Sequence, residues 1–200
     1  MKYIFLLITS FAFAQQTQFV DFKSVSAQLT LNAKEKKVSG AVDYDFEVLK
    51  PIDTIIIDAK NMEFTNGKID GKEAVFVNTS KQLQLISNFQ KGKNHLTFQY
   101  SAKPKQALYF VDIENSQVQI WTQGQGRYTS NWFPSFDDVS EKVIFNLGIS
   151  YDASYQVISN GALKEKTSKG NEFHWQYEME KPMSSYVLML AVGKFEKKRF

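Results

Sequence analysis

The sequence contains no cysteine, only four prolines and only two histidines among its 200 residues. Without cysteine the chain forms no disulfide and has no thiolate for catalysis or metal binding, so its stability must come from packing. His95 and His174 lie far apart, and neither has a second ligand at the spacing of a helical zinc motif. We therefore expect two surface histidines and no zinc site within these residues. A serine–histidine triad stays open, because its members need not be neighbours in sequence.

An excess of charge of one sign is lacking as well. The chain carries 24 Lys and Arg against 21 Asp and Glu, a net charge of +3, with the two signs interspersed. This balance gives no reason to expect nucleic acid or an acidic membrane surface as a partner.

No apolar run is long enough to cross a bilayer, which takes about 20 residues. The run from Tyr3 to Phe13 follows Lys2 and ends in Ala12-Phe13-Ala14, the small-x-small pattern of a signal peptidase site. Residues 1–14 are therefore predicted to be a signal peptide cleaved after Ala14, and the mature protein is expected to be periplasmic or secreted. A buried N-terminal strand is the alternative interpretation.

The remaining residues, 15–200, follow the period of β-strands. Apolar and polar residues alternate in three segments, whose apolar members are Val42, Tyr44, Phe46 and Val48, then Leu96, Phe98 and Tyr100, then Val143, Phe145, Leu147 and Ile149. The near-continuous apolar runs Ile55–Ile57 and Tyr186–Val192 predict strands covered on both faces. Hairpin turns are expected at Asn66-Gly67, Asp70-Gly71, Lys91-Gly92, Asn160-Gly161 and Lys169-Gly170. No helical period occurs after the signal peptide. These patterns predict one all-β domain, a large twisted antiparallel sheet or sandwich.

One long segment, 122–140, interrupts the strand pattern. Polar and glycine residues come first, then the aromatic residues Trp132, Phe133 and Phe136, then Asp137 and Asp138. Long loops are usually functional or disordered, and the aromatic cluster favours a packed loop. The two carboxylates, with Glu141 close by, could form an acid/base pair of the glycosidase type. We favour the simpler interpretation, that Asp137 fixes the loop by accepting backbone N–H bonds.

The stretch WTQGQGRYTSNWFPSFDD, residues 121–138, resembles a signature of the aminopeptidase N family of zinc metallopeptidases (gluzincins). In that family T-Q-x-[EQ] is followed, after a short loop, by F-P-x-F-D. The matching residues are Thr122, Gln123, Gln125, Phe133, Pro134, Phe136 and Asp137. Weaker matches in the same order cover nearly the whole mature chain, from Val38-Ser39-Gly40 to Val192-Gly193-Lys194-Phe195. Ser135 departs from the family's usual cysteine, and Gln125 stands where most members have glutamate.

The resemblance implies that residues 15–200 are the saddle-like N-terminal β-domain of such an enzyme. The family's G-x-M-E-N and H-E-x-x-H motifs are absent, so a catalytic domain that binds zinc is expected after residue 200, and this chain alone is expected to be inactive. Gln123 and Gln125 are expected to bind the N-terminus of a peptide substrate. The residues expected to support their loop are Trp132, Phe133, Pro134, Phe136 and Asp137. The expected partners are that peptide and the catalytic domain of the same polypeptide.

A function of a different class also fits the sequence: a stand-alone exported β-domain that binds peptide or glycan without catalysis. Trp121, Tyr128 and Trp132 could then form an aromatic platform for the ligand. Sequencing the gene beyond codon 200 would discriminate the two, because only the enzyme requires the zinc motifs downstream.

Overall fold

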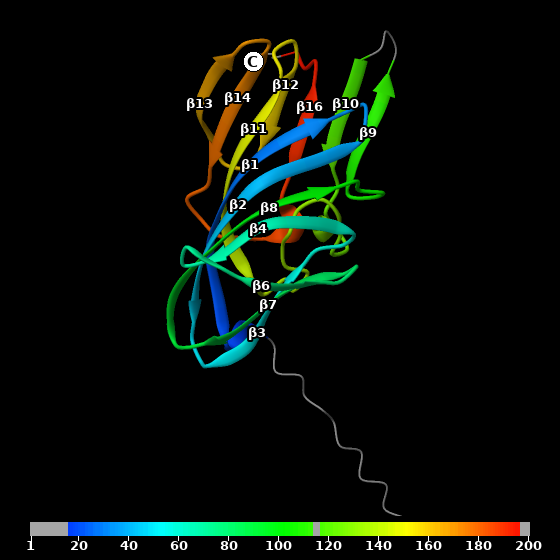
Figure 1. The fold of residues 1–200 in the computed structure, drawn as a ribbon. Helices are drawn as coiled ribbons and strands as arrows, with labels where there is room; N and C mark the ends of the chain where they lie inside the picture. Colours follow the sequence, from blue (N-terminus) through cyan, green and yellow to red (C-terminus); the bar gives the residue numbers. More distant parts are fainter. Residues whose placement is uncertain (1–15, 114–116, 197–200) are drawn as a thin grey trace, which may run out of the picture.

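The structure is a computed structural model that describes residues 16–113 and 117–196 (Figure 1). Their backbone forms strands and three short 3-10 helices, η1 (Gln16–Gln18), η3 (Thr129–Asn131) and η4 (Ser185–Val187), and none of the described residues is α-helical. No helix in this part of the chain has the length and apolar character needed to cross a membrane. The predicted signal peptide lies outside the described residues. The strands are β1 (Val20–Asn32), β2 (Lys37–Val48), β3 (Ile52–Asp58), β4 (Met62–Ile69), β5 (Lys72–Glu73), β6 (Val75–Asn78), β7 (Gln82–Phe89), β8 (Gly92–Ala102), β9 (Leu108–Ile113), β10 (Gln117–Thr122), β11 (Lys142–Asp152), β12 (Gln156–Ser159), β13 (Ala162–Lys169), β14 (Glu172–Glu178), β15 (Met183–Ser184) and β16 (Leu190–Gly193).

The strands form three sheets. The large sheet has the order β13-β14-β11-β1-β2-β8-β4-β5, with β15 paired to β11; the two small sheets are β12-β16-β10-β9 and β3-β7-β6. The all-β prediction is confirmed. The predicted large antiparallel sheet is present, with one parallel pair in it: β1 and β11 run parallel, with Val25 opposite Phe145 and Leu29 opposite Ile149. A parallel pair needs a long crossover connection. The chain between β1 and β11 is long enough to build most of the other strands first.

The core lies between one face of the large sheet and the two small sheets. The alternating apolar residues of β2, β8 and β11 are buried on that inner face, as the sequence predicts. They belong to one continuous cluster with Ile120 of β10 and Val192 of β16. The hydroxyl of Tyr177 in β14 also donates to the Val157 carbonyl in β12 at 2.7 Å, so it joins the large sheet to a small one. In Figure 1 the sheet β3-β7-β6 lies at the lower end of the molecule.

Two of the five predicted hairpin turns join paired strands: Asp70-Gly71 between β4 and β5, and Lys169-Gly170 between β13 and β14. Lys91-Gly92 and Asn160-Gly161 connect strands that belong to different sheets, so they are not hairpins. Asp70 and Gly71 connect β4 to β5 with positive φ angles of 50° and 77°. Asn66-Gly67 is not a hairpin turn. These residues form a bulge inside β4, where the pairing with β8 shifts register between Thr65 and Lys68. A Cβ atom on Gly67 would lie 1.6 Å from the ring of Phe76, so glycine at this position serves the close packing of that ring.

The run Tyr186–Val192 is also not the doubly covered strand that its composition predicts. Only Leu190–Gly193 forms a strand, and η4 precedes it. Leu188 and Leu190 are buried, whereas Tyr186, Val187 and Met189 are exposed. Apolar composition alone therefore did not distinguish a covered strand from a segment with one apolar face open to solvent.

Candidate functional site

The loop between β10 and β11, residues 123–141, packs its aromatic residues beneath the inner face of the large sheet. Trp132, Phe133, Pro134 and Phe136 are all buried. The ring of Phe136 lies 4.4 Å from that of Phe22 in β1, measured between ring centroids. Side chains of this size dominate the energetics of a core, so the sequence F-P-x-F anchors the loop by burial.

Two tyrosine hydroxyls of the large sheet hold the same stretch by its backbone. Tyr44 of β2 donates to the carbonyl of Pro134 at 2.7 Å, and Tyr100 of β8 donates to the carbonyl of Trp132 at 3.1 Å. Both phenols are buried, and this desolvation raises the pKa of each. They therefore stay neutral donors, and they satisfy carbonyl groups that a buried loop would otherwise leave unpaired.

The end of β3 clamps the middle of the loop. Asp58 and Ser135 exchange two backbone hydrogen bonds, of 2.9 and 3.0 Å. The ammonium group of Lys60 donates to the Asp137 carboxylate at 2.8 Å and to the carbonyl of Arg127 at 3.1 Å. The hydroxyl of Ser130 donates to the other carboxylate oxygen of Asp137 at 2.8 Å. Asp137 thus ties the loop together through side-chain donors rather than through the backbone amides that we expected.

The start of the loop is fixed to the chain around η4. The Thr129 hydroxyl donates to the carbonyl of Ser185 at 2.9 Å, and the Leu190 amide donates to the hydroxyl of Thr122 at 2.9 Å. A Cβ atom on Gly124 would lie 2.4 Å from the carbonyl oxygen of Tyr186, so only glycine permits this close approach. The segment between Thr122 and Thr129 is consequently held at both ends.

Gln123 and Gln125 project from this fixed segment. The backbone amide of Gln123 donates to the Ala107 carbonyl at 2.8 Å, whereas its side chain is exposed. Gln125 is exposed too, and it precedes Gly126, whose φ is 87°. Each side-chain amide offers one carbonyl acceptor and two N–H donors. The structure therefore brings both predicted glutamines onto one surface loop that has a braced backbone.

The other chemically interesting side chains are engaged separately. His95 lies between two carboxylates, with Nε2 2.7 Å from Asp43 and Nδ1 2.9 Å from Asp45, and the hydrogen bond to Asp45 raises the pKa of the imidazole. Nδ1 of His174 lies 3.1 Å from the Ser150 hydroxyl. Within residues 16–113 and 117–196, no three His, Cys, Asp or Glu side chains are grouped so that they could hold a metal ion. The described residues thus offer no site that fits the family's zinc.

The three carboxylates that could have formed an acid/base pair have different partners. Asp137 accepts from Lys60, and Asp138 accepts from the backbone and hydroxyl of Ser140, hydrogen bonds that lower the pKa of Asp138. Glu141 is buried, its Oε1 accepts from the Phe22 amide at 3.2 Å, and burial raises its pKa to about 7. Each group is used to hold the chain in place, which favours the loop-fixing interpretation.

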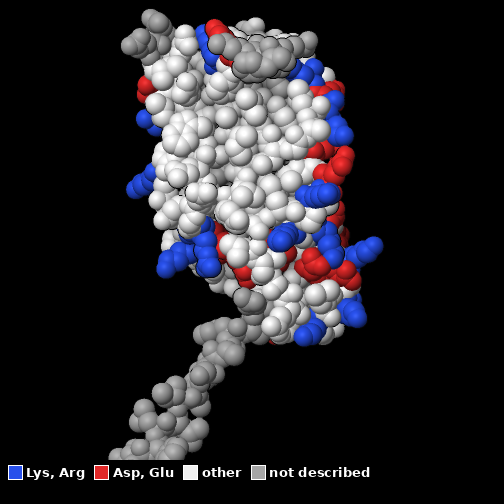
Figure 2. Space-filling view, turned by 180° about the vertical axis from the view of Figure 1, so that it is seen from behind, with Lys and Arg blue, Asp and Glu red and all other residues white. Residues whose placement is uncertain are grey.

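The outer face of the sheet β12-β16-β10-β9 carries an apolar row that the sequence patterns did not predict. The register places Tyr109, Trp121, Ala191 and Ile158 side by side across the four strands. Trp121 is 40% exposed and Ile158 is 43% exposed. Figure 2 shows the side of the molecule turned away in Figure 1, where a broad surface has charged residues mainly at its margins. A contiguous exposed apolar surface usually marks an interaction site.

Two of the three residues of the predicted aromatic platform remain accessible. Tyr128 is 43% exposed, but Trp132 is fully buried beside Phe133 in the core. The platform of Trp121, Tyr128 and Trp132 is therefore not formed. Local sequence patterns carry no signal for this difference, because tryptophan serves cores and binding surfaces equally well.

Known proteins resemble this chain in sequence and in fold. The peptidase M1 N-terminal domain family matches residues 23–187. A leucyl aminopeptidase of Saccharolobus solfataricus is 24% identical over 149 residues, which are 74% of this chain and 19% of that protein. Transcription initiation factor TFIID subunit 2 of Gallus gallus is 31% identical over 114 residues, 52% of this chain and 10% of that protein.

Among solved structures, a mutant M1 zinc metallopeptidase from Deinococcus radiodurans bound to a Tyr-Ser-Ala substrate superposes with a TM-score of 0.77 at 17% identity. The match covers 88% of this chain and 43% of that one. The chain spans about a fifth or less of the length of these two curated relatives. The match over residues 23–187 confirms the resemblance seen in the sequence: this chain belongs to the peptidase M1 family, whose N-terminal domain it carries.

Proposed function

We propose that this domain positions the N-terminus of a peptide substrate for an exported zinc aminopeptidase. In this proposal the domain forms one wall of the active-site cleft. Zinc and the hydrolytic residues belong to a catalytic domain that follows in the same polypeptide, because the described residues hold no cluster that could bind the metal. The predicted signal peptide supports export to the periplasm or the medium.

The observation that carries the proposal is the contrast between the loop and its two glutamines. The loop backbone is held by Lys60, by Tyr44 and Tyr100, and by the buried aromatic residues, whereas Gln123 and Gln125 point their amides to solvent. A substrate ammonium group that loses its water needs oxygen acceptors fixed in place. An acceptor on a braced loop sets the distance from the amine to the bond that is cut, which selects for removal of the first residue.

The catalytic domain is proposed to pack against the apolar row of β9, β10, β16 and β12. The loop of Gln125 begins after Thr122, the last residue of β10 and the neighbour of Trp121, so a domain docked on that row would lie beside the two glutamines. The leucyl aminopeptidase relative is about five times longer than the matched region, which leaves room for such a domain.

The test is a kinetic comparison on the complete gene product with aminoacyl reporter substrates. We expect Gln125→Ala to lower kcat/KM by roughly tenfold to a hundredfold, the loss of one hydrogen bond to a charged group. Gln90→Ala, which removes an exposed loop glutamine between β7 and β8, serves as the matched control. An N-acetylated reporter should respond equally little to both changes. If Gln125→Ala leaves the preference for a free amine unchanged, the assigned role is wrong.

A second measurement concerns the isolated chain, residues 15–200. We expect it to hydrolyse no aminoacyl reporter when zinc is added. Activity that appears with zinc and disappears with a chelator would refute the assignment of zinc binding and hydrolysis to the catalytic domain. Sequencing the gene beyond codon 200 should reveal G-x-M-E-N followed by H-E-x-x-H.

A further inference from the structure

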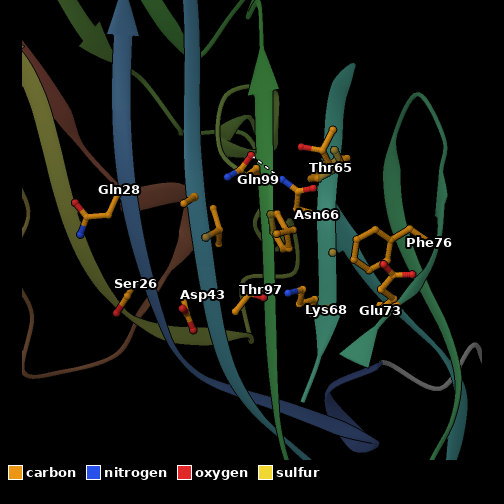
Figure 3. A pocket seen from close by; sticks show the side chains of 16 residues that line it. Ser26, Gln28, Asp43, Thr65, Asn66, Lys68, Glu73, Phe76, Thr97 and Gln99 are labelled. Atoms are coloured by element: carbon orange, nitrogen blue, oxygen red, sulfur yellow. Dashed lines mark hydrogen bonds between the residues drawn. The ribbon is translucent and has the colours of Figure 1, made fainter. Parts of the chain in front are cut away.

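A polar groove of about 1030 Å³ lies on the outer face of the large sheet, opposite the core and opposite the loop of Gln125 (Figure 3). Its floor is formed by β1, β2, β8 and β4. Glu73 and Phe76, which belong to β5 and β6, stand at one side, as the close-up shows. Another hollow on the described surface, beside β5, β6 and β7, measures about 440 Å³. The proposed aminopeptidase function does not use the larger groove.

The strand register organises the floor into two parallel rows. One row crosses the sheet through Gln28, Ala41, Gln99 and Thr65, and the next crosses it through Ser26, Asp43, Thr97 and Lys68. Because side chains of a strand alternate between faces, both rows point away from the core. Figure 3 shows these polar side chains reaching into the same space from neighbouring strands.

Small residues and one aromatic ring give the groove its shape. Ala41 has a short side chain, so the groove is deepest at the centre of the first row, between Gln28 and Gln99. The bulge at Gly67 lets the half-buried ring of Phe76 lie directly over the backbone of β4, so the ring forms an apolar wall beside the polar floor. Asn66, also in the bulge, donates to the side-chain oxygen of Gln99 at 3.1 Å, which orients the amide of Gln99. An amide held in this way has both of its N–H donors aimed by the protein.

The lining excludes several classes of ligand. A peptide could not add a strand to the floor, because β2 and β8 are paired on both edges. Nucleic acid and phosphorylated ligands need an excess of cations. The lining has one, Lys68, against Asp43 and Glu73. His95 already contacts one carboxylate oxygen of Asp43, and Asn66 already donates to Gln99. A largely apolar small molecule would displace water from the remaining hydrogen-bonding atoms of the floor without replacing it.

We propose that this groove binds a neutral oligosaccharide. A chain of sugar rings presents rows of hydroxyl groups, each both donor and acceptor, at a spacing that amide, hydroxyl and carboxylate side chains can follow. Gln28, Gln99 and the carboxylate oxygen of Asp43 that does not contact His95 would pair with these hydroxyls from the floor. The ring of Phe76 would pack against the apolar face of one sugar. The site is open at the surface, which suits one stretch of a longer polymer. It is separate from the surface proposed to meet the catalytic domain, so both functions can operate in one molecule.

The experiment is an NMR titration of the full chain with neutral hexasaccharides of glucose, xylose and mannose, in parallel with a hexamer of galacturonic acid. We expect the side-chain amide signals of Gln28, Asn66 and Gln99 to shift with at least one neutral sugar, and not with the anionic hexamer. Shifts with none of the neutral sugars would overturn the proposal. Stronger shifts with the anionic hexamer would overturn it as well, because the charge argument would then be wrong.

Two variants locate the site. Ala41→Trp fills the floor from a solvent-facing position and should abolish binding, and Gln99→Ala should weaken it by about tenfold, as expected for one lost pair of hydrogen bonds. Gln119→Ala is the matched control, since Gln119 is an exposed strand glutamine of the other sheet. Sugar binding that survives both groove variants, or that is lost with Gln119→Ala, would place the ligand elsewhere and overturn the proposal. A failure here leaves the peptidase proposal untouched, because that one is tested by kinetics at Gln125.

Discussion

Glu141 offers the sharpest prediction about the stability of this domain. Its side chain is 5% exposed, and Oε1 accepts a hydrogen bond from the amide of Phe22, next to the bulge in β1. Its pKa is raised from 4.5 to about 7. Burial is the largest cause and the carboxylates of Asp21 and Asp138 add to it, whereas the hydrogen bond from Phe22 and the charge of Lys23 oppose it. The folded protein therefore holds a proton on Glu141 that the unfolded chain has already released at neutral pH.

The sign of the pH dependence follows from that difference. Between pH 4.5 and about 7 the folded state binds more protons than the unfolded state, so stability falls as the pH rises through this window. A pKa difference of this size corresponds to roughly 3 kcal/mol. The loss is complete once the pH exceeds the pKa of the folded state, and it is absent below about 4.5.

Replacing Glu141 by glutamine should remove this cost, because the amide oxygen can still accept the bond from Phe22 without carrying a charge. We expect Glu141→Gln to raise the free energy of unfolding by up to about 3 kcal/mol at pH 8 and by little at pH 4.5. Urea denaturation across this pH range measures both. Glu165→Gln on the exposed strand β13 is the control and should change little. The reasoning is refuted if the wild type and Glu141→Gln lose stability in parallel as the pH rises.

Three further predictions test other parts of the structure, one by titration and two by substitution. Each ring nitrogen of His95 contacts a carboxylate, and both can donate only when the ring is protonated and charged. The pKa of His95 is therefore raised in the folded protein. The resulting contribution to folding stability is complete below about pH 6.5 and is lost as the pH rises through the folded-state pKa. An NMR titration should find that pKa above the ordinary value, and a lower one would contradict the geometry. Ser135→Ala should stabilise the chain by about 1 kcal/mol in thermal unfolding, because its buried hydroxyl has no partner in the described residues; a loss of stability would reveal a partner. Lys60→Met should cost about 1–2 kcal/mol and speed amide exchange between residues 123 and 130, since Lys60 joins Asp137 to the loop backbone. Unchanged exchange would show that the aromatic residues alone brace the loop.

Much of the fold could be predicted from local patterns. The alternation in β2, β8 and β11 identified the buried face of each strand, and the signature around Phe133 and Phe136 was sufficient to identify the family. Asp70-Gly71 marked a true hairpin because tight turns need the positive φ that this pair adopts. These features depend on a few neighbouring residues, so the sequence contains them directly.

Other features depended on partners that lie far away in the chain. The same type of dipeptide at Asn66-Gly67 became a bulge, because Phe76 covers Gly67 and the pairing with β8 continues beyond it. Trp132 looked as suitable for a ligand platform as Trp121, and only the packing of the loop beneath the large sheet separates the buried ring from the exposed one.

Local patterns were sufficient to identify an all-β domain of the peptidase M1 family and to single out the loop that carries Gln123 and Gln125. The folded structure was needed to establish that β1 and β11 pair in parallel, that Lys60, Tyr44 and Tyr100 brace that loop, and that polar rows from four strands line one groove. The two kinds of feature differ in the range of the interactions that produce them. Strand period and turn chemistry are set by adjacent residues, whereas register, burial and pKa are set by groups that meet only after the chain has folded.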